Sequence, residues 1–500
     1  MSNHLFDALL AARSRAQDAL FVANGQQLVD NATFFDLVAR ISSVLLAVRV
    51  KPGDRVAAQV HKSHEALALY LACLRVGAVF LPLNTAYTQG ELQYFIDDAT
   101  PQLFVVDPES EKMARQLLDA ARVLTLSSDG KGTLADAASQ AAAMDHVVPR
   151  SADDLAAILY TSGTTGRSKG AMLTHENLLS NALTLVQLWH FSADDVLLHA
   201  LPVFHTHGLF VASNVMLLCG GSMIFQPRFD IEAVLASLPD ANTMMGVPTF
   251  YTRLLSDQRF TKDLVGHMRL FISGSAPLLA DTHHEFEART GQRILERYGM
   301  TETNMNTSNP YDGQRVAGTV GLPLPGVSVR ICDQQTHIPV SSGDVGVLHV
   351  KGPNVFCGYW QMPEKTAEEL LPDGYFVTGD LATIDDEGYI TIVGRSKDLI
   401  ISGGYNIYPK EIELMIDELD SVVESAVVGV PHADFGESVV AVVVPAAHTA
   451  VSLDASAVLD FLDGKLARFK LPRRVEFVDE LPRNAMGKVQ KNILREQCSQ

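Results

Sequence analysis

A regular alternation between short apolar runs and amphipathic segments constrains the fold of this chain more than any other feature. The apolar runs are rich in β-branched and aromatic residues, and we expect strands at 55–60, 78–83, 102–107, 155–160, 222–227, 243–247 and 269–274. The segment 173–189 has helical spacing, with Thr174 as a plausible N-cap. This alternation predicts α/β layers with substantial parallel sheet.

The chain has 500 residues, which is too many for one hydrophobic core. Its texture changes near residue 395, where GRSKDLIISGGYNIYPKEIE leads into a smaller βαβ-like tail. We therefore predict a large N-terminal domain, residues 1–396, and a small C-terminal domain, residues 397–500. The joint is charged and contains glycine, so movement of the small domain is possible.

A loop rich in glycine, hydroxyl residues and cations, TSGTTGRSKG, follows the apolar run LAAILY. Glycines let backbone N–H groups approach an anion closely, and successive N–H groups form an anion-binding nest. The loop therefore predicts a polyphosphate ligand. It is not a Walker A loop, because Ser168 stands where glycine is needed and Gly170 where Ser or Thr should hold Mg²⁺. The dinucleotide fingerprint G-x-G-x-x-G is also absent here.

Composition excludes some partners. The formal net charge of -19 argues against nucleic acid, although a local basic pocket for an anionic substrate remains possible. Five scattered cysteines without a CxxC pair indicate neither disulfides nor a zinc knuckle, and the N-terminus does not resemble a secretory signal, so we expect a cytoplasmic protein. The uncharged stretch Val196–Gln226 is broken by Pro202 and Gly220-Gly221, which favours a buried helix, a turn and a strand over a membrane span.

Four further motifs accompany the loop: YGMTE at 298–302, GD at 379–380, GRSKD at 394–398 and PRNAMGK at 482–488. In this order the five motifs resemble the adenylate-forming acyl-CoA synthetase superfamily, and the resemblance covers essentially the whole chain. It implies a large N-terminal domain of layered sheets and helices and a small, mobile α+β C-terminal domain.

The stretches HTHGLFVASN, GVPTFYTRLL, SGSAPL and ERYGMTETNMNTSNPYDG resemble the malonyl-CoA synthetases within that superfamily. The resemblance implies that malonate and ATP give malonyl-AMP and pyrophosphate, and that coenzyme A then displaces AMP to give malonyl-CoA. It also implies Mg²⁺ as cofactor and a place in fatty acid metabolism. Methylmalonate is an expected second substrate.

The same resemblance assigns roles to individual residues. Glu302 would hold Mg²⁺, Thr301 would contact the α-phosphate, and Asp380 and Arg395 would bind the ribose. The other expected ATP-binding residues are Thr161, Ser162, Gly163, Thr164, Thr165, Gly166, Lys169, Gly274, Ser275, Ala276, Tyr298, Gly299 and Met300.

Three parts of the C-terminal region also receive roles by resemblance. Lys488 would bridge the substrate carboxylate and the α-phosphate during adenylation, and acetylation of its amine by a lysine acetyltransferase would then inactivate the protein. Lys397 would be the hinge about which the small domain rotates between the two half-reactions. Ser402, Gly403, Gly404 and Tyr405 would line the channel for the pantetheine thiol of coenzyme A.

Two arginines favour a dicarboxylate substrate. Arg253 follows GVPTFYT and Arg297 precedes YGMTE, the segments around which the acyl pocket of this family is built. Guanidiniums in or beside a desolvated pocket require an anionic partner, and arginine binds carboxylates through two parallel hydrogen bonds. Ser275 could add a donor. His205 is expected at the border of the pocket, since HTHG lacks the spacing of a zinc-binding HExxH motif.

Two other functions remain open at this stage. One is an adenylation domain that feeds a separate carrier protein, and the other is a catalytically silent binding paralogue. The presence of Thr165, Glu302, Asp380 and Lys488 argues against the silent form. Thioester release with free coenzyme A would distinguish the active ligase from both. The sequence does not decide the preference between malonate and methylmalonate, or the oligomeric state.

Overall fold

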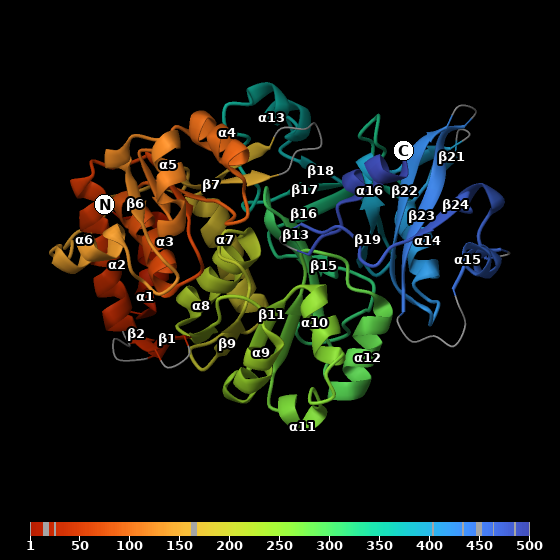
Figure 1. Ribbon diagram of the computed structural model, residues 1–500, viewed down its shortest axis with the longest axis horizontal. Coiled ribbons are helices and arrows are strands. Elements are labelled where there is room, and N and C mark those ends of the chain that lie inside the picture. The colour runs from red at the N-terminus through yellow and green to blue at the C-terminus, as the bar shows by residue number, and fades with distance from the viewer. Residues whose placement is uncertain are drawn as a thin grey trace. The chain divides into compact units, whose positions relative to one another are not determined.

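The computed structural model describes residues 2–13, 20–24, 27–161, 168–402, 405–432, 435–446, 453–463, 465–484 and 487–499. The chain forms two compact units (Figure 1). Unit 1 comprises Met1–Ser328 and Val350–Phe376, and unit 2 comprises Val329–His349 and Val377–Gln500. The predicted α/β class with a larger and a smaller part is confirmed. The predicted boundary at 396/397 separates off residues 397–500 as the small domain that rotates about Lys397, and it stays a prediction.

Unit 1 contains a nine-stranded sheet whose central strands are parallel. In spatial order its strands are β15 (Leu322–Pro323), β14 (Asn304–Ser308), β13 (Leu295–Met300), β12 (Leu270–Ser273), β11 (Thr243–Gly246), β9 (Val196–His199), β10 (Ser222–Phe225), β1 (Leu20–Asn24) and β2 (Gln27–Asp30). The antiparallel pairs lie at its two ends, β1–β2 at one and β13–β14–β15 at the other.

Unit 1 also contains a six-stranded sheet, parallel except for its last pair. Its order is β6 (Val123–Thr125), β5 (Leu103–Val106), β3 (Arg55–Gln59), β4 (Val79–Pro82), β7 (Leu155–Thr161) and β8 (Lys169–Thr174). The seven strands predicted from apolar runs are all present, as β3, β4, β5, β7, β10, β11 and β12.

Thirteen α-helices are described in unit 1. They are α1 (His4–Ala11), α2 (Asn31–Ala47), α3 (His64–Val76), α4 (Gln89–Ala99), α5 (Glu111–Leu117), α6 (Thr133–Gln140), α7 (His175–Leu188), α8 (Asn214–Cys219), α9 (Ile231–Ser237), α10 (Pro248–Leu255), α11 (Lys262–Val265), α12 (Ala280–Thr290) and α13 (Pro363–Glu369). The predicted cap of α7 is confirmed, since the side chain of Thr174 accepts from the N–H of Asn177.

One hydrophobic core of unit 1 lies between the nine-stranded sheet and the helices packed against it. In Figure 1, α9, α10 and α12 lie together around β11. Their buried residues, among them Val234, Tyr251 and Phe286, pack with Met244 of β11 and Phe271 of β12. Helix packing against this sheet therefore fixes the ends of β11 and β12, which carry site residues.

The uncharged stretch folds as a π-helix, η4 (His207–Ser213), followed by α8, a turn and β10. Gly220 has φ of 85°, a left-handed conformation that glycine adopts without strain, and it ends α8. The predicted helix, turn and strand are confirmed. Within the described part of the chain, every helix is too short or too polar to span a bilayer.

Unit 2 contains two sheets. The four-stranded sheet has the order β16 (Ser328–Cys332), β17 (Gly346–Lys351), β18 (Phe376–Ile384) and β19 (Ile390–Arg395). A few terminal residues of β16, β17 and β18 are assigned to unit 1. The other has the order β21 (Tyr405–Ile407), β20 (Ile400–Ser402), β23 (Gly436–Pro445) and β22 (Val422–His432), with β24 (Arg474–Phe477) paired to β23. Its helices are α14 (Pro409–Ile416), α15 (Ala455–Leu462) and α16 (Lys491–Cys498).

The apolar runs of unit 2 are continuous because β22 and β23 are covered on both faces. Val427 and Val439 point to a core shared with α14 and α15, whereas Val428 and Val440 point to one shared with α16. Successive side chains of a strand face opposite sides, so a sheet buried on both faces needs apolar residues at every position. The parallel pairing of β23 with β24 across α15 confirms the predicted βαβ-like tail.

Candidate active site

The carboxyl ends of four parallel strands, β9, β11, β12 and β13, meet at one edge of the nine-stranded sheet. Ligands of open α/β sheets bind outside such an edge. Gly274, Ser275 and Ala276 directly follow β12, and Tyr298, Gly299 and Met300 end β13. The expected ATP-binding residues 274–276 and 298–300 therefore lie at neighbouring positions on this edge.

A tight reversal between β13 and β14 positions Glu302. A Cβ built on Gly299 would lie 1.9 Å from the carbonyl oxygen of Asn304, so only glycine allows this approach. The carboxylate of Glu302 is buried, and its Oε1 lies 3.0 Å from the hydroxyl oxygen of Tyr359 and 3.5 Å from that of Thr161. Thr301 is partly exposed beside it.

The loop predicted to bind phosphates connects two antiparallel strands, because Thr161 at the end of β7 pairs with Lys169 at the start of β8. Residues 162–167, which include the predicted Ser162, Gly163, Thr164, Thr165 and Gly166, lie outside the described residues. A P-loop runs from a strand into a helix, so the hairpin connection supports the rejection of a Walker A site.

Lys169 is buried next to acidic groups. Its Nζ lies 3.0 Å from the hydroxyl of Tyr359 and 3.1 Å from both carboxylate oxygens of Glu369 at the end of α13. The ammonium also lies 4.1 Å from the centroid of the Tyr359 ring. Lys169 is thus a fixed cation at the end of the loop.

Arg297 is the most deeply buried cation at the carboxyl edge. Its guanidinium covers Gly274, where an added Cβ would lie 2.4 Å from Cζ. Nε and Nη2 have no hydrogen-bond partner among the described residues. Burial lowers the pKa of Arg297 to about 9, although Tyr251 and Glu296 oppose this. A buried guanidinium with two donor nitrogens that lack partners among the described residues is suited to an anionic ligand.

Ser275 and His207 lie close to Arg297. Ser275 has φ of 72°, a strained conformation for a residue other than glycine, and its Oγ lies 3.2 Å from Nδ1 of His207. His207 is fully buried in η4, and burial, together with the charge of Arg297, lowers its pKa well below the ordinary value. His207 is therefore neutral and can accept or donate one hydrogen bond on each ring nitrogen.

The other two residues expected at the acyl pocket, His205 and Arg253, are less buried. His205 is partly buried, and its Nδ1 accepts from the backbone N–H of His207 at 3.4 Å. Arg253 lies on the exposed side of α10, whose buried side carries Tyr251 and Leu254. Arg253 is therefore exposed to solvent, and its predicted place beside the acyl pocket stays a prediction. Its guanidinium is accessible to a ligand, but the desolvation argument applies to Arg297 alone.

In unit 2, Asp380 and Arg395 face each other across β18 and β19. Nε of Arg395 lies 2.8 Å from Oδ1 of Asp380, which is almost fully buried. Gly379, with φ of 71°, precedes the aspartate. A buried carboxylate held by an arginine can accept hydrogen bonds from a diol, as predicted for the ribose.

Lys488 directly follows a turn at Gly487. Gly487 has φ of 74°, and the N–H of Lys488 donates to Oδ1 of Asn484 at 3.0 Å. The side chain retains exposed surface, but partial desolvation of its amine and the positive charges of Arg395 and Lys397 lower the pKa of Lys488 to about 8. The amine therefore changes charge near neutral pH.

The predicted hinge and coenzyme A residues follow β19. Lys397 lies in the one-turn helix η6 (Ser396–Asp398), and burial and Arg395 lower its pKa. Ser402 is buried and pairs with Tyr405 across β20 and β21. Gly403 and Gly404, which join these strands, lie outside the described residues.

The residues present fit Mg²⁺ held together with phosphates. Among the described residues, no group of three or more His, Cys, Asp or Glu side chains could hold a metal by itself. Mg²⁺ usually takes one or two carboxylates and completes its octahedron with phosphate oxygens and water. The single oriented carboxylate of Glu302 matches that pattern.

The family models match both parts of the chain. The model described as "AMP-binding enzyme" matches residues 10–360, and "AMP-binding enzyme C-terminal domain" matches residues 411–488. The chain belongs to the AMP-binding enzymes.

Two curated members of this family illustrate the range of its acids. An indoleacetate–CoA ligase of Aromatoleum aromaticum is 37% identical over 92% of this chain and 91% of its own length. A malonate–CoA ligase of Arabidopsis thaliana is 36% identical over 89% of this chain and 78% of its own length.

Among solved AMP-binding enzymes, ATP-bound MatB from Rhodopseudomonas palustris is 57% identical, covering 100% of this chain and 99% of its own, with a TM-score of 0.97. Apo MatB from the same organism aligns over the same shares with a TM-score of 0.85. A benzoate CoA ligase from Burkholderia xenovorans, at 26% identity, aligns with a TM-score of 0.89. Together with the malonate–CoA ligase, these relatives confirm the resemblance predicted from the motifs.

Sequence reasoning missed several buried or partly buried polar residues of this AMP-binding enzyme. Tyr359 and Glu369 lie against Lys169, but neither belongs to the five motifs. Nζ of Lys62 lies 2.9 Å from Nδ1 of His199, whose Nε2 lies 2.9 Å from the carbonyl oxygen of Gly208 in η4. The local sequence contains no signal for the burial of Lys62, because it is flanked by the polar residues His61, Ser63 and His64.

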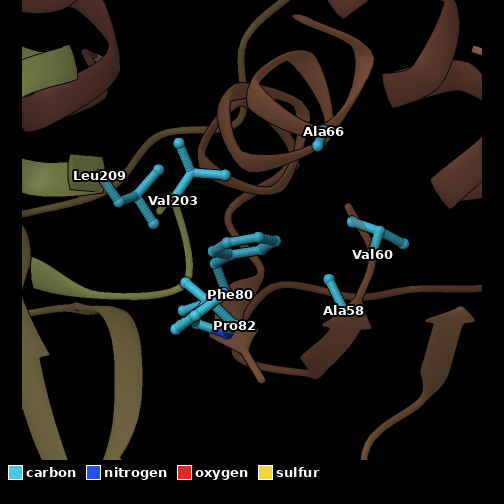
Figure 2. A pocket seen from close by; sticks show the side chains of 8 residues that line it. Ala58, Val60, Ala66, Phe80, Pro82, Val203 and Leu209 are labelled. Atoms are coloured by element: carbon cyan, nitrogen blue, oxygen red, sulfur yellow. The ribbon is translucent and has the colours of Figure 1, made fainter. Parts of the chain in front are cut away.

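A small apolar cavity near η4 is distinct from these polar groups (Figure 2). Phe80, Val203 and Leu209 line it, and its volume is about 10 Å³. That volume is close to the space required by one water molecule. The cavity is therefore too small for a carboxylic acid substrate.

Proposed function

We propose that this AMP-binding enzyme is an AMP-forming acid–thiol ligase that joins malonate to coenzyme A through an acyl-adenylate. The observation that carries the substrate class is the buried guanidinium of Arg297, with two donors unpartnered among the described residues, beside Ser275 and His207. The 57% identity to MatB and the matches to malonate–CoA ligases support the proposal.

In the first half-reaction, a malonate carboxylate oxygen attacks the α-phosphorus of ATP. The bond between the α- and β-phosphates breaks, and pyrophosphate leaves. Lys169 and the loop 161–169 hold the β- and γ-phosphates, Thr301 contacts the α-phosphate, and Glu302 holds Mg²⁺. Bound Mg²⁺ would neutralise charge on the phosphate oxygens. Lys488 places its positive charge between the reacting carboxylate and the α-phosphate.

In the nucleotide site, the remaining residues bind and orient ATP. Asp380 accepts hydrogen bonds from the ribose hydroxyls, and Arg395 keeps that carboxylate oriented. The strip Gly274–Ala276 flanks the adenine, and the YGM segment 298–300 completes this edge. The positions of these last two segments at the carboxyl edge of β12 and β13 support their proposed roles.

In the second half-reaction, the thiol of coenzyme A loses its proton and attacks the acyl carbon, and AMP leaves with the electrons of the broken acyl–phosphate bond. Ser402, Gly403, Gly404 and Tyr405 line the thiol channel. Rotation of residues 397–500 about Lys397 withdraws Lys488 between the two steps.

The substrate proposal assigns the distal carboxylate to Arg297, with Arg253, Ser275 and His205 at the border of the pocket. Arg297 contributes through desolvation, whereas the exposed Arg253 attracts the anion from solvent. Methylmalonate retains both carboxylates and is a proposed second substrate. We also propose a cytoplasmic location, a place in fatty acid metabolism, and inactivation by a lysine acetyltransferase acting on Lys488.

The test is a panel of acids assayed for AMP release that depends on both ATP and coenzyme A: malonate, methylmalonate, succinate, acetate and octanoate. The expected result is thioester formation from malonate, with acetate and octanoate far slower. Formation of the acyl-adenylate without release of a coenzyme A thioester would instead favour an adenylation domain that feeds a carrier protein. A protein that binds ATP but turns over none of these acids would favour a silent paralogue.

A further inference from the structure

The hydroxyl of Tyr359 connects the proposed metal ligand to the loop lysine. It lies 3.0 Å from Oε1 of Glu302, 2.6 Å from Oε2 of Glu369 and 3.0 Å from Nζ of Lys169. Tyr359 is held by backbone pairing with Ala171 in β8, the strand that begins at Lys169. The tyrosine and the lysine are therefore fixed relative to each other.

Glu369 supplies the negative charge opposite Lys169. Its carboxylate lies 3.1 Å from the ammonium through both oxygens, and the side chain of Lys169 is only 9% exposed. Although burial raises the pKa of Glu369, hydrogen bonds from Tyr359 and the ammoniums of Lys365 and Lys169 outweigh it and lower the pKa. The carboxylate is thus ionised at neutral pH, and it forms a true ion pair with Lys169.

Lys365, which lies on α13 with Glu369, also forms an ion pair with the Glu369 carboxylate. Nζ of Lys365 lies 2.9 Å from Oε1 of Glu369 and 2.7 Å from Oε2 of Glu368. If Lys169 turns to another anion, Glu369 keeps Lys365 and Tyr359 as partners. The desolvation cost that usually follows the loss of one member of a buried pair is thereby reduced.

We propose that Glu369 is a positioning residue that competes with the phosphates of ATP for Lys169, and so weakens the binding of ATP and of pyrophosphate. This inference rests on the proposed function, in which Lys169 is a phosphate ligand. An ammonium has three N–H donors, and here Glu369 and Tyr359 already accept from the ammonium of Lys169, so a phosphate must compete with them for those donors. Glu369 therefore favours release of pyrophosphate after adenylation, at a cost in ATP affinity.

The test measures the dissociation constants of Mg·ATP and Mg·pyrophosphate by calorimetry on the full-length protein. Glu369→Gln keeps the shape and removes the charge, and we expect both ligands to bind about tenfold more tightly, equivalent to about 1.4 kcal/mol. Glu368→Gln is the matched control, because Glu368 contacts Lys365 and is 64% exposed. We expect the control to bind both ligands as the parent protein does.

A double-mutant cycle separates competition from a structural role. In a Lys169→Ala background, Glu369→Gln is expected to leave both dissociation constants unchanged, since the group for which it competes is absent. Weaker ligand binding or no change in Glu369→Gln alone would overturn the inference. Should Glu369→Gln unfold, Glu369→Ala serves the same comparison. If Lys169→Ala itself binds ATP normally, the proposed role of Lys169 fails, which is a distinct outcome.

Discussion

Gly274 leaves the space that the guanidinium of Arg297 occupies, because a Cβ at Gly274 would lie 2.4 Å from both Cζ and Nη1. We expect Gly274→Ala to displace Arg297 and to lower kcat/KM for malonate by about 10²-fold, the cost of a small misplacement in a catalytic site. Steady-state kinetics with each substrate varied will test this. Gly90→Ala is the control, since a Cβ there meets no atom within 4 Å.

The preference for a dicarboxylate depends on Arg297. Sites built around a polar substrate group reject analogues that lack it by up to about 10⁵-fold, so we expect malonate to exceed acetate in kcat/KM by at least about 10³-fold. Succinate, whose longer spacer misplaces the reacting carboxylate, should be slower than malonate by about 10²-fold. Octanoate or acetate used as efficiently as malonate would refute the dicarboxylate proposal.

Arg297→Ala and Arg253→Ala should reduce malonate activity far more than ATP affinity. The exposed Arg259, which pairs with Glu232 and Asp257, supplies the control Arg259→Ala. Arg297→Lys should not restore activity, because an ammonium lacks the planar pair of donors that a guanidinium offers a carboxylate. Full malonate activity in both Arg253→Ala and Arg297→Ala would show that neither arginine binds the substrate.

Lys488→Ala should nearly abolish adenylation but leave thioester formation from supplied malonyl-AMP largely intact. Partial desolvation and neighbouring cations lower the pKa of Lys488 to about 8, so its positive charge is lost as the pH rises through that value. Adenylation should therefore decline above about pH 8 in single-turnover assays. In Lys488→Arg, which stays charged, that alkaline decline should disappear, even if the rate is lower. An acetylated protein with full activity would contradict the role of the amine.

Lys397→Pro tests the hinge. Proline fixes φ and removes the backbone donor, so a backbone that must rotate at this residue is restrained. We expect the thioester step to slow more than adenylation, measured separately with malonyl-AMP and with malonate plus ATP. An unchanged ratio of the two rates would place the rotation elsewhere.

Much of the fold was predictable, because neighbouring residues determine it. Apolar runs of the right length became strands, and Thr174 caps α7 as its local sequence indicated. The motifs similarly predicted that Asp380 and Arg395 act together, and they are direct cross-strand partners. The exposure of Arg253 could also have been predicted from the sequence, since the apolar residues 251, 254 and 255 define the buried side of α10.

The sequence by itself determined the strands, the caps, the turns and the family, since each depends on residues close together in the chain. Tertiary structure alone decided which charges are buried and which meet. Lys169 and Glu369 are separated by 200 positions, and backbone pairing of the segment around Tyr359 with β8 brings α13 to the lysine. Arg253 and Arg297 are the same residue type, but the fold buries the side chain of Arg297 and leaves that of Arg253 exposed to solvent. The free energy of a charged side chain depends far more on whether the fold buries it than on which residues precede and follow it in the sequence.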